Sequence, residues 1–273
     1  MFQNQVAIVT GAGRGIGAAA AKLFAQNGAK VIVNDLNQEP ADEVVAEVKM
    51  AGGEATAVAG DVTDPKFPEH LMQTTIDTYG KINILVNNAG FTWDVMAHKM
   101  TDEQWQKIID VHATAPFRMI RAVAPYMRDP AKEEKRAGGA MEPRCIINVS
   151  STSGLHGNVG QANYATGKMG IVGLTKTIAK EWGFLGIRCN TVAFGFIDTR
   201  LTQSKDKGAS IEIDGQKVAL GIPDNLRSMA PMTIPLQRPA TPEEAAGGII
   251  MLASPFAAYV TGHTLEVTGG AGI

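Results

Sequence analysis

The feature that most constrains the fold is a regular alternation, along the whole chain, of short apolar runs and segments with helical spacing. The apolar runs cover residues 6–10, 31–34, 56–59, 84–87, 145–149, 187–192 and 265–267. The helical patterns cover residues 15–27, 41–51, 68–79, 102–127, 162–181 and 242–252. Strands that alternate with helices pair in parallel and are covered on both faces. The sequence therefore predicts an α/β fold, in which residues 1–273 form a single domain around a doubly wound parallel sheet of about seven strands.

Two segments interrupt this alternation. Residues 129–143 are charged and contain glycine, which is typical of a solvated, mobile loop. Residues 201–233 contain a predicted β-hairpin around Asp214 and Gly215, in which Glu212 faces Lys217 and Ile211 faces Val218.

The second segment also has an apolar character that suits a lid. Met229 and Met232 follow the hairpin, and flexible apolar side chains fit a lid over an apolar substrate. We therefore predict that residues 201–233 form an inserted substrate lid. The alternative is a surface excursion with no role in substrate binding.

Composition excludes several classes of function. A net charge of −2 and a pI of about 6.2 argue against a nucleic-acid or acidic-membrane partner. The first apolar run begins close to Met1, and no long apolar stretch follows, so we expect a cytoplasmic protein without a membrane span. Cys145 and Cys189 lie in apolar runs and are expected to be buried and reduced. The five histidines form no cluster, and no metal site is predicted.

A glycine-rich turn follows the first apolar run. Gly11, Gly15 and Gly17 come between that run and a helical pattern that begins at Ile16. Strand, turn and helix in this order form a pyrophosphate site, because glycines let the backbone approach the phosphates and a helix N-terminus offers free N–H groups. The turn alone is a weak signal in a chain with 30 glycines, but its context predicts nucleotide binding.

The second apolar run ends in an acid. Asp35 lies 18 residues after Gly17, where a carboxylate can accept both hydroxyls of an adenosine ribose. Leu36 and Asn37 follow, so no adjacent cation would meet a 2′-phosphate. This favours NAD(H) over NADP(H), although Arg14 in the glycine turn can still contact a phosphate. The alternative is that Asp35 only caps the turn at the end of its strand.

Three polar residues in the second half of the chain indicate redox chemistry on an oxygen. Tyr164 and Lys168 lie four residues apart in a predicted helix and share one face, and Ser151 precedes them. A free tyrosine has a pKa of about 10, and a cation beside it lowers that pKa. With Ser151 to orient a substrate oxygen, the set suits a carbonyl–alcohol oxidoreductase. Taken singly, these residues would instead be a packed tyrosine, a solvated lysine and a strand-end cap.

Together these motifs resemble the short-chain dehydrogenase/reductase superfamily over nearly the whole chain. The matching residues are Thr10 to Gly17, Asp35, Asp61, Val62, Asn87 to Gly90, Ser151, Tyr164, Lys168, Phe194 to Thr199, Gly269 and Gly270. Within the superfamily the chain is similar to the β-ketoacyl-acyl-carrier-protein reductases and to the hydroxyacyl-CoA dehydrogenase part of peroxisomal multifunctional enzymes. The resemblance implies a Rossmann-type fold, a nicotinamide cofactor and a homotetramer.

The resemblance also implies a role for each matching residue. Tyr164 would be the acid in reduction and the base in oxidation, Lys168 would hold the nicotinamide ribose, and Ser151 would bind the reacting oxygen. Asp61 and Val62 would flank the adenine, while Asn88, Ala89 and Gly90 would back the ribose. The full set of implied cofactor-binding residues is Gly11, Arg14, Gly15, Ile16, Gly17, Asp35, Asp61, Val62, Asn88, Ala89, Gly90, Tyr164, Lys168, Ile197 and Thr199.

The chain departs from the family pattern at two positions that concern the site. His112 stands where the family usually has an Asn whose turn positions a water linking Lys168 to solvent. An imidazole both donates and accepts, so His112 is predicted to serve this relay and to titrate near neutral pH. Phe194 stands where the family commonly has Pro, which would place an aromatic wall near the nicotinamide. The segments 129–143 and 201–233 also extend the usual outline.

The predicted reaction is reversible hydride transfer between a nicotinamide and a secondary alcohol or ketone. The side chains expected to line an apolar substrate pocket are Phe91, Trp93, Gln161, Phe194, Phe196, Met229 and Met232. Such a pocket suits a 3-oxoacyl or 3-hydroxyacyl thioester, and it also suits a steroid or terpene alcohol. A function of another class, an NAD-sensing protein without turnover, stays open at this point.

Overall fold

The computed structural model of the chain describes residues 1–213, 216–222 and 224–272. The strands are β1 (Val6–Val9), β2 (Lys30–Asp35), β3 (Glu54–Ala59), β4 (Ile84–Asn87), β5 (Arg144–Ser151), β6 (Ile187–Phe194), β7 (Ser210–Ile213), β8 (Gln216–Ala219) and β9 (Thr264–Val267). The α-helices are α1 (Gly15–Gln26), α2 (Gln38–Met50), α3 (Phe67–Tyr79), α4 (Asp102–Ile109), α5 (Ala115–Ala137), α6 (Thr152–His156), α7 (Ala162–Trp182), α8 (Asp224–Thr233) and α9 (Pro242–Ala253).

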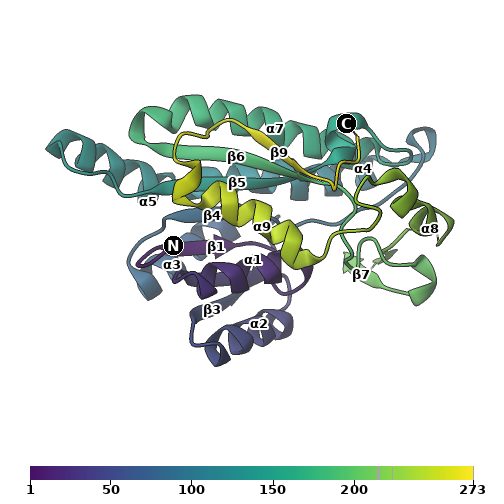
Figure 1. Cartoon of the computed structure of the whole chain (residues 1–273), viewed down its shortest axis with the longest axis horizontal. Coiled ribbons are helices and arrows are strands. Elements are labelled where there is room, and N and C mark those ends of the chain that lie inside the picture. The colour runs from purple at the N-terminus through teal and green to yellow at the C-terminus, as the bar shows by residue number, and fades with distance from the viewer. Residues whose placement is uncertain (214–215, 223, 273) are drawn as a thin grey trace.

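Seven of the strands form one parallel sheet in the order β3-β2-β1-β4-β5-β6-β9 (Figure 1). The runs VAIV in β1 and ILVN in β4 are buried throughout, as expected of strands that are covered on both faces. This confirms the predicted Rossmann-type sheet. β1 pairs with both β2 and β4, so the chain reverses its direction of winding between β1 and β4. Ligands of such sheets bind at this point, outside the carboxyl ends of the strands.

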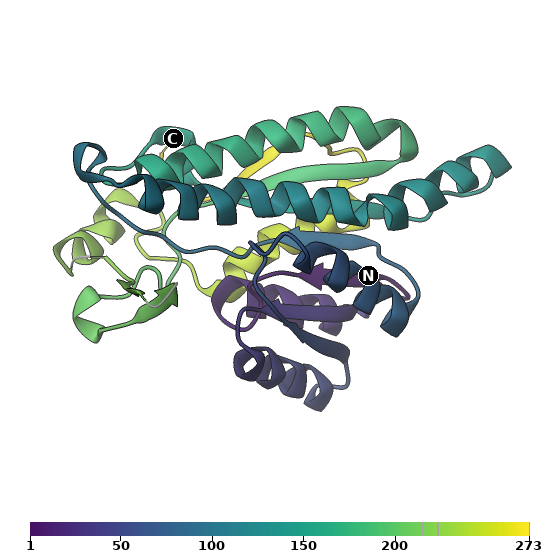
Figure 2. The same cartoon turned by 180° about the vertical axis from the view of Figure 1, so that it is seen from behind.

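Helices cover the sheet on its two faces, with a separate apolar core under each layer. One core joins the sheet to α1, α2 and α9 through residues such as Phe24, Val44 and Ile249. The other core joins it to α3, α5 and α7, through residues such as Leu71 and Met119. Figures 1 and 2 show α5 and α7 side by side along the sheet, and the C-terminal end of α5 projects beyond it.

The predicted helix over residues 102–127 is interrupted and extended in the structure. A single π-helical turn, Asp110–Thr114, separates α4 from α5 and contains His112. π-turns of this kind are frequently found at functional sites. Thr101 begins α4 with a capping box to Gln104, so the start of the helix is fixed independently of the turn.

The prediction that residues 129–143 form a mobile loop was wrong, because α5 continues to Ala137. Met127 and Ala131 continue its buried face beyond the expected end. Glu134 then accepts two hydrogen bonds from the buried Arg144 side chain, at 2.6 and 2.9 Å, and one from the Glu142 backbone at 2.9 Å. A charge pattern alone did not reveal that one of these acids has a buried arginine as its partner.

The hairpin predicted within residues 201–233 is present, with Glu212 opposite Lys217 and Ile211 opposite Val218. Its turn residues, Asp214 and Gly215, lie outside the described residues. Figure 1 shows the hairpin and α8 at the right, beyond the main sheet. The Arg227 side chain anchors α8, since it donates to the Thr202 carbonyl at 2.9 Å and the Asp198 carboxylate at 3.0 Å.

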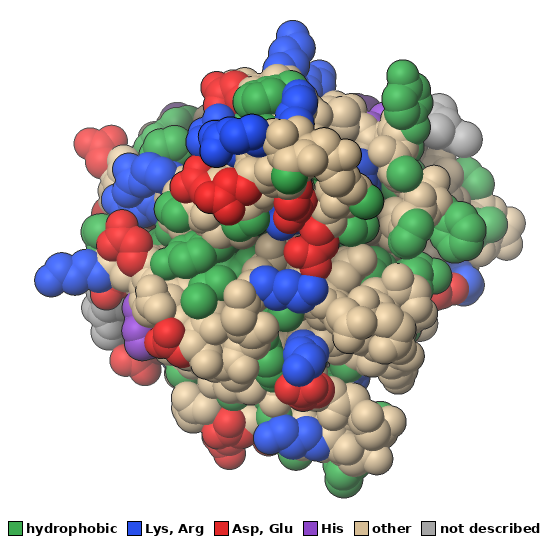
Figure 3. Space-filling view, turned by 90° about the vertical axis from the view of Figure 1, so that its left-hand side faces the viewer, with side chains coloured by type: hydrophobic (Ala, Val, Ile, Leu, Met, Phe, Trp, Pro, Cys, Tyr) green, Lys and Arg blue, Asp and Glu red, His purple; other side chains and the backbone are tan. Residues whose placement is uncertain are grey.

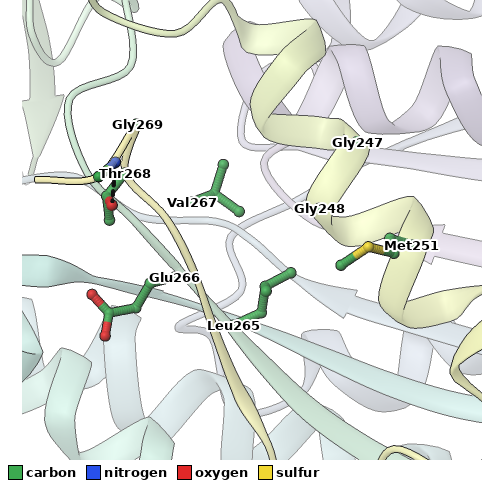
Figure 4. A pocket seen from close by; sticks show the side chains of 9 residues that line it. Gly247, Gly248, Met251, Leu265, Glu266, Val267, Thr268 and Gly269 are labelled. Carbon is green, nitrogen blue, oxygen red and sulfur yellow. Dashed lines mark hydrogen bonds between the residues drawn. The ribbon is translucent and has the colours of Figure 1, made fainter. Parts of the chain in front are cut away.

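A groove of about 500 Å³ lies between α9 and the edge strand β9 (Figure 4). Met251, Leu265 and Val267 project into it, while Glu266 points to the other side of the strand. In the part of the chain that the structure describes, the helices are too short or too polar to cross a bilayer.

Candidate active site

The glycine-rich turn connects the end of β1 to the first turn of α1. Arg14 occupies the N-cap position with an exposed side chain that makes no capping hydrogen bond, and the first turn contains no acid. The helix N-terminus therefore keeps backbone donors and a positive dipole for an anion. Gly17 packs against the turn so closely that a Cβ there would lie 2.3 Å from the Gly11 carbonyl oxygen. Ile16 is partly buried against the core below.

Asp35 lies at the end of β2, next to the glycine turn. One of its carboxylate oxygens accepts a hydrogen bond from the Gly13 backbone N–H at 2.9 Å, and the other accepts one from Asn37 N–H at 3.4 Å. The structure thus brings Asp35 and the glycine turn together as the sequence predicted. It also supports the alternative role of Asp35 as a turn cap, because the same carboxylate serves both backbone groups.

The ends of β3 and β4 lie beside those of β1 and β2 at the carboxyl edge of the sheet. Thr10 Oγ1 accepts hydrogen bonds from the Asn88 and Ala89 backbones at 3.0 and 3.1 Å, and the Asn88 side chain donates to the Thr10 carbonyl at 2.8 Å. Asp61 follows β3 with an exposed carboxylate that accepts from Thr63, whereas Val62 is buried in the core. The four strand ends predicted to hold a dinucleotide are therefore adjacent.

Two short contacts attach α7 to the end of β5. Ser150 donates to the Lys168 carbonyl at 2.6 Å, and the Lys168 ammonium nitrogen donates to the Val149 carbonyl at 2.8 Å. Ser151, the next residue, ends β5 and caps α6 by accepting from the Ser153 backbone at 3.2 Å. The predicted strand-end cap is therefore present, and it leaves the hydroxyl of Ser151 at the carboxyl edge of the sheet.

Tyr164 and Lys168 lie together, as their spacing predicts. The Lys168 nitrogen is 5.6 Å from the centre of the Tyr164 ring. Burial raises the pKa of Tyr164 to about 12, against the lowering effect of a hydrogen bond from Ser151. Burial also lowers the pKa of Lys168 to about 7. The expectation that the lysine would depress the tyrosine pKa is therefore not met in the protein alone, because desolvation of both groups outweighs their attraction.

His112 packs edge-on against Tyr164, with 4.9 Å between the ring centres. Its Nε2 is 2.7 Å from the Phe91 carbonyl oxygen and donates to it, and its buried Nδ1 has no hydrogen-bond partner. Burial and the nearby Lys168 charge hold the pKa of His112 well below its usual value. The expected titration near neutral pH is therefore wrong. Gly90 makes room for the ring, since a Cβ there would lie 2.2 Å from His112 Cε1.

The segment after β6 contributes a further side of the site. Thr199 lies against the glycine turn, with its methyl group 3.6 Å from the position of a Cβ on Gly15. Phe194 and Ile197 are instead buried in the core under α9, at 5% and 3% exposure. An aromatic wall formed by Phe194 is therefore not observed, because β6 directs this side chain into the core. Phe196 remains partly exposed.

The remaining predicted substrate residues come from three segments of the chain. Trp93 is partly exposed in the loop between β4 and α4, and Gln161 is buried at the start of α7. Met229 and Met232 are exposed on α8, which leaves both the lid and the surface-excursion alternatives open. Sequence reasoning missed Asp94, whose carboxylate accepts from the Gln161 amide. The one available signal was its place directly after Trp93.

These residues fit a nicotinamide dinucleotide. The helix N-terminus and glycine turn suit the pyrophosphate, and Asp35 suits a ribose diol. Thr199 faces the turn, and Lys168 and Tyr164 occupy the far end of the same edge. The arrangement places a phenol and an amine at the same edge of the sheet as the glycine turn.

Comparisons with known proteins agree with this geometry. The family model described as short chain dehydrogenase matches residues 5–210. A protein named 3-oxoacyl-[acyl-carrier-protein] reductase from Synechocystis is 41% identical, over 97% of this chain and 96% of its own. Proteins of the same name from Thermotoga maritima and Escherichia coli are 38% and 37% identical, each over 98% of both chains.

Replacing Lys168 by Met tests the cost of burying this amine. Its pKa of about 7 lies below the ordinary value of 10.5, so between these pH values the unfolded chain binds one proton more than the folded chain. The group therefore destabilises the fold at neutral pH, and the penalty shrinks as the pH rises. We expect Lys168→Met to raise the free energy of unfolding by about 2–4 kcal/mol near pH 7, net of the lost hydrogen bond to Val149.

Urea unfolding followed by tryptophan fluorescence, at about pH 7 and about pH 10, measures this gain. The gain should be smaller at the higher pH, where the unfolded lysine also loses its proton. Lys176→Met, at an exposed position on the same helix, is the matched control. A gain that does not change with pH would show that the charge is not its cause.

Proposed function

The chain belongs to the short chain dehydrogenase family of oxidoreductases, which use a nicotinamide cofactor, and from this premise we propose an NAD(H)-dependent 3-oxoacyl thioester reductase. The reverse reaction, oxidation of the 3-hydroxyacyl thioester, uses the same groups. The observation that carries the proposal is the cluster of the buried Lys168 with the partly exposed Ser151 and Tyr164 at the carboxyl edge of the sheet. The relatives whose names specify 3-oxoacyl substrates support the choice of thioester.

Three residues of the chain would act directly on the substrate. When bound, the reduced nicotinamide supplies a hydride to the ketone carbon. Ser151 would hold the ketone oxygen, and Tyr164 would donate its phenolic proton to that oxygen as it gains charge. Because burial raises the pKa of Tyr164 to about 12, the phenol is protonated at neutral pH and ready to donate.

Lys168 and His112 would prepare Tyr164 for its next proton. The Lys168 amine has a pKa of about 7, so both of its protonation states are accessible at neutral pH. We propose that it binds the nicotinamide ribose and gains charge when it does so, which lowers the tyrosine pKa as the sequence motif anticipated. His112 would serve the relay as a neutral imidazole, because its buried Nδ1 is free to accept a hydrogen bond.

The substrate is proposed only as far as the thioester. The names of the relatives favour an acyl carrier protein. An acidic carrier protein would need basic side chains, and Arg118, Arg121 and Arg128 on α5 are the candidates. All three have contacts within the protein: Arg118 donates to the Thr63 carbonyl, and Arg121 and Arg128 lie over the rings of Phe117 and Trp182. Because these arginines are engaged, we favour a CoA thioester. Figure 3 shows the opposite end of the molecule, away from the hairpin and α8, where basic and acidic side chains are also interspersed. Residues 201–233 are proposed as the substrate lid, and a steroid or terpene alcohol remains the alternative substrate.

Assembly into a homotetramer is also part of the proposal. Phe117 on α5 and Met169 on α7 are exposed apolar side chains on neighbouring helices. The groove between α9 and β9 exposes a second apolar region at the edge of the sheet. Apolar side chains exposed together in this way are typical of contacts between subunits.

Replacing Tyr164 by Phe tests the central residue. We expect kcat for a 3-oxoacyl-CoA to fall by about 10²–10⁴, since a positioned acid is lost, while the dissociation constant for NADH changes little. Tyr126→Phe is the control, because the Tyr126 hydroxyl contacts Gln73 on the outer surface. A wild-type protein that binds NADH but reduces no ketone in a broad panel, and is indifferent to Tyr164→Phe, would instead be a sensor.

The cofactor preference can be measured independently of the substrate. We expect kcat/KM for NADH to exceed that for NADPH, because the Asp35 carboxylate would repel a 2′-phosphate. Asp35→Asn keeps an acceptor for Gly13 and removes the charge, and it should narrow the ratio by roughly ten-fold. A wild-type preference for NADPH would exclude this role for Asp35.

The relay role of His112 requires two substitutions. His112→Ala should lower kcat by roughly ten-fold and alter the pH–rate profile, because proton return to Tyr164 slows. His112→Asn should recover most of the rate, since an amide also donates and accepts. Thermal unfolding of each variant separates this effect from lost packing, as the ring is 3% exposed. Equal rates in all three proteins would show that His112 only fills space.

A further inference from the structure

A carboxylate that the proposed mechanism does not use is held at the entrance to the site. Asp94 lies in the loop between β4 and α4, and its two oxygens are 3.1 and 3.0 Å from the donating Gln161 Nε2. Gln161 is 8% exposed, and its own oxygen accepts a hydrogen bond from Asn158 at 3.1 Å. The position of Asp94 is therefore fixed by the buried amide of Gln161, and Gln161 lies three residues before Tyr164 in the chain.

The backbone on either side of Asp94 is fixed to the same segment. The fully buried Asn163 donates to the Trp93 carbonyl at 3.2 Å, and Val95 N–H donates to the Gly160 carbonyl at 2.8 Å. Three consecutive residues of the loop are thus bonded to the start of α7. Asp94 is exposed to solvent, and this attachment holds its carboxylate beside Gln161, at the start of the helix whose first turn carries Tyr164.

The titratable groups near Tyr164 and Asp94 come from four segments. Lys168 lies on α7 and has a pKa of about 7, and His112 in the π-turn has a pKa well below its usual value, so neither holds a full positive charge at neutral pH. Asp94 approaches from the loop, and its negative charge raises the pKa of Tyr164. Partial burial raises the pKa of Asp94, while the hydrogen bond from Gln161 and the charge of Lys205, after β6, oppose this effect.

We propose that Asp94 is a specificity-determining residue, whose negative charge beside Tyr164 admits 3-oxoacyl esters and thioesters and excludes the free 3-oxo acids. The inference rests on the proposed function. In a 3-oxo acid one methylene separates the ketone carbon from the carboxylate. When Ser151 and Tyr164 hold the ketone oxygen, that carboxylate must lie inside the site with Asp94, and two like charges repel there.

A thioester or ester at the same position is neutral and meets no such repulsion. The charged groups of CoA or of a carrier protein lie at the far end of the pantetheine arm, beyond the thioester and away from Asp94. Across the separations possible within one cleft, a like-charge pair at an effective dielectric constant of about 20 discriminates by roughly ten-fold. The Asp94 charge therefore discriminates a free carboxylate from an ester or thioester, and this discrimination does not depend on the length of the acyl chain.

The test compares ethyl acetoacetate with acetoacetate as ketone substrates, with NADH, for the wild type and for Asp94→Asn. We expect the wild type to prefer the ester, and Asp94→Asn to raise kcat/KM for acetoacetate relative to the ester by roughly ten-fold. Asp94→Glu, which keeps the charge, should keep the preference. Asp77→Asn is the matched control, because the Asp77 carboxylate also accepts from a glutamine amide, but on the outer helix α3. An unchanged ratio in Asp94→Asn would overturn the proposal.

A second readout separates this proposal from the proposed function. If the wild type reduces neither compound, the proposed function fails, and the charge effect is then judged from tyrosinate absorbance. Asp94→Asn should lower the pKa of Tyr164. This pKa is obtained from the pH dependence of the tyrosinate absorbance that each protein loses when Tyr164→Phe is added. Asp94→Glu should leave that pKa near its wild-type value. A Tyr164 pKa that is the same in Asp94→Asn and the wild type would sink the proposal on its own.

Discussion

The attachment of α7 to β5 is the constraint on which the rest of the site depends. The Lys168 side chain and the Lys168 carbonyl both bond to β5, at Val149 and Ser150. Because the strand ends one residue later, the same attachment brings the Ser151 hydroxyl next to the helix face that carries Tyr164. The parallel sheet then places this cluster on the same edge as the glycine turn after β1. The proposed catalytic residues and the proposed cofactor site therefore share one rigid support.

The site is costly to the fold because it buries groups that prefer water. Desolvation raises the pKa of Tyr164 to about 12 and lowers that of Lys168 to about 7. The motif alone suggests that the cation lowers the tyrosine pKa, but this holds only where the cation keeps its charge. In the protein itself burial dominates, and a bound ligand that restores the lysine charge would couple cofactor binding to acidity at Tyr164.

Most of the fold could be predicted from sequence, because buried parallel strands and their helices carry strong local patterns. β4 was predicted to the residue, and the hairpin register followed from the pairing of Glu212 with Lys217. The errors arose where a distant partner decides the structure. The C-terminal part of α5 depends on Arg144, which bonds to Glu134. The pKa of His112 depends on a burial that the residue type does not reveal.

The same distinction explains why the reaction type is easier to predict than the substrate. Ser151, Tyr164 and Lys168 belong to regular elements, so their spacing in sequence translates directly into a common site. The substrate side is built from loops whose positions follow from long-range contacts, such as Val95 to Gly160 and Asp94 to Gln161. Neither contact has a sequence signature, since each needs both loops in place. The contacts that we propose to select the substrate are therefore ones that only a structure makes visible.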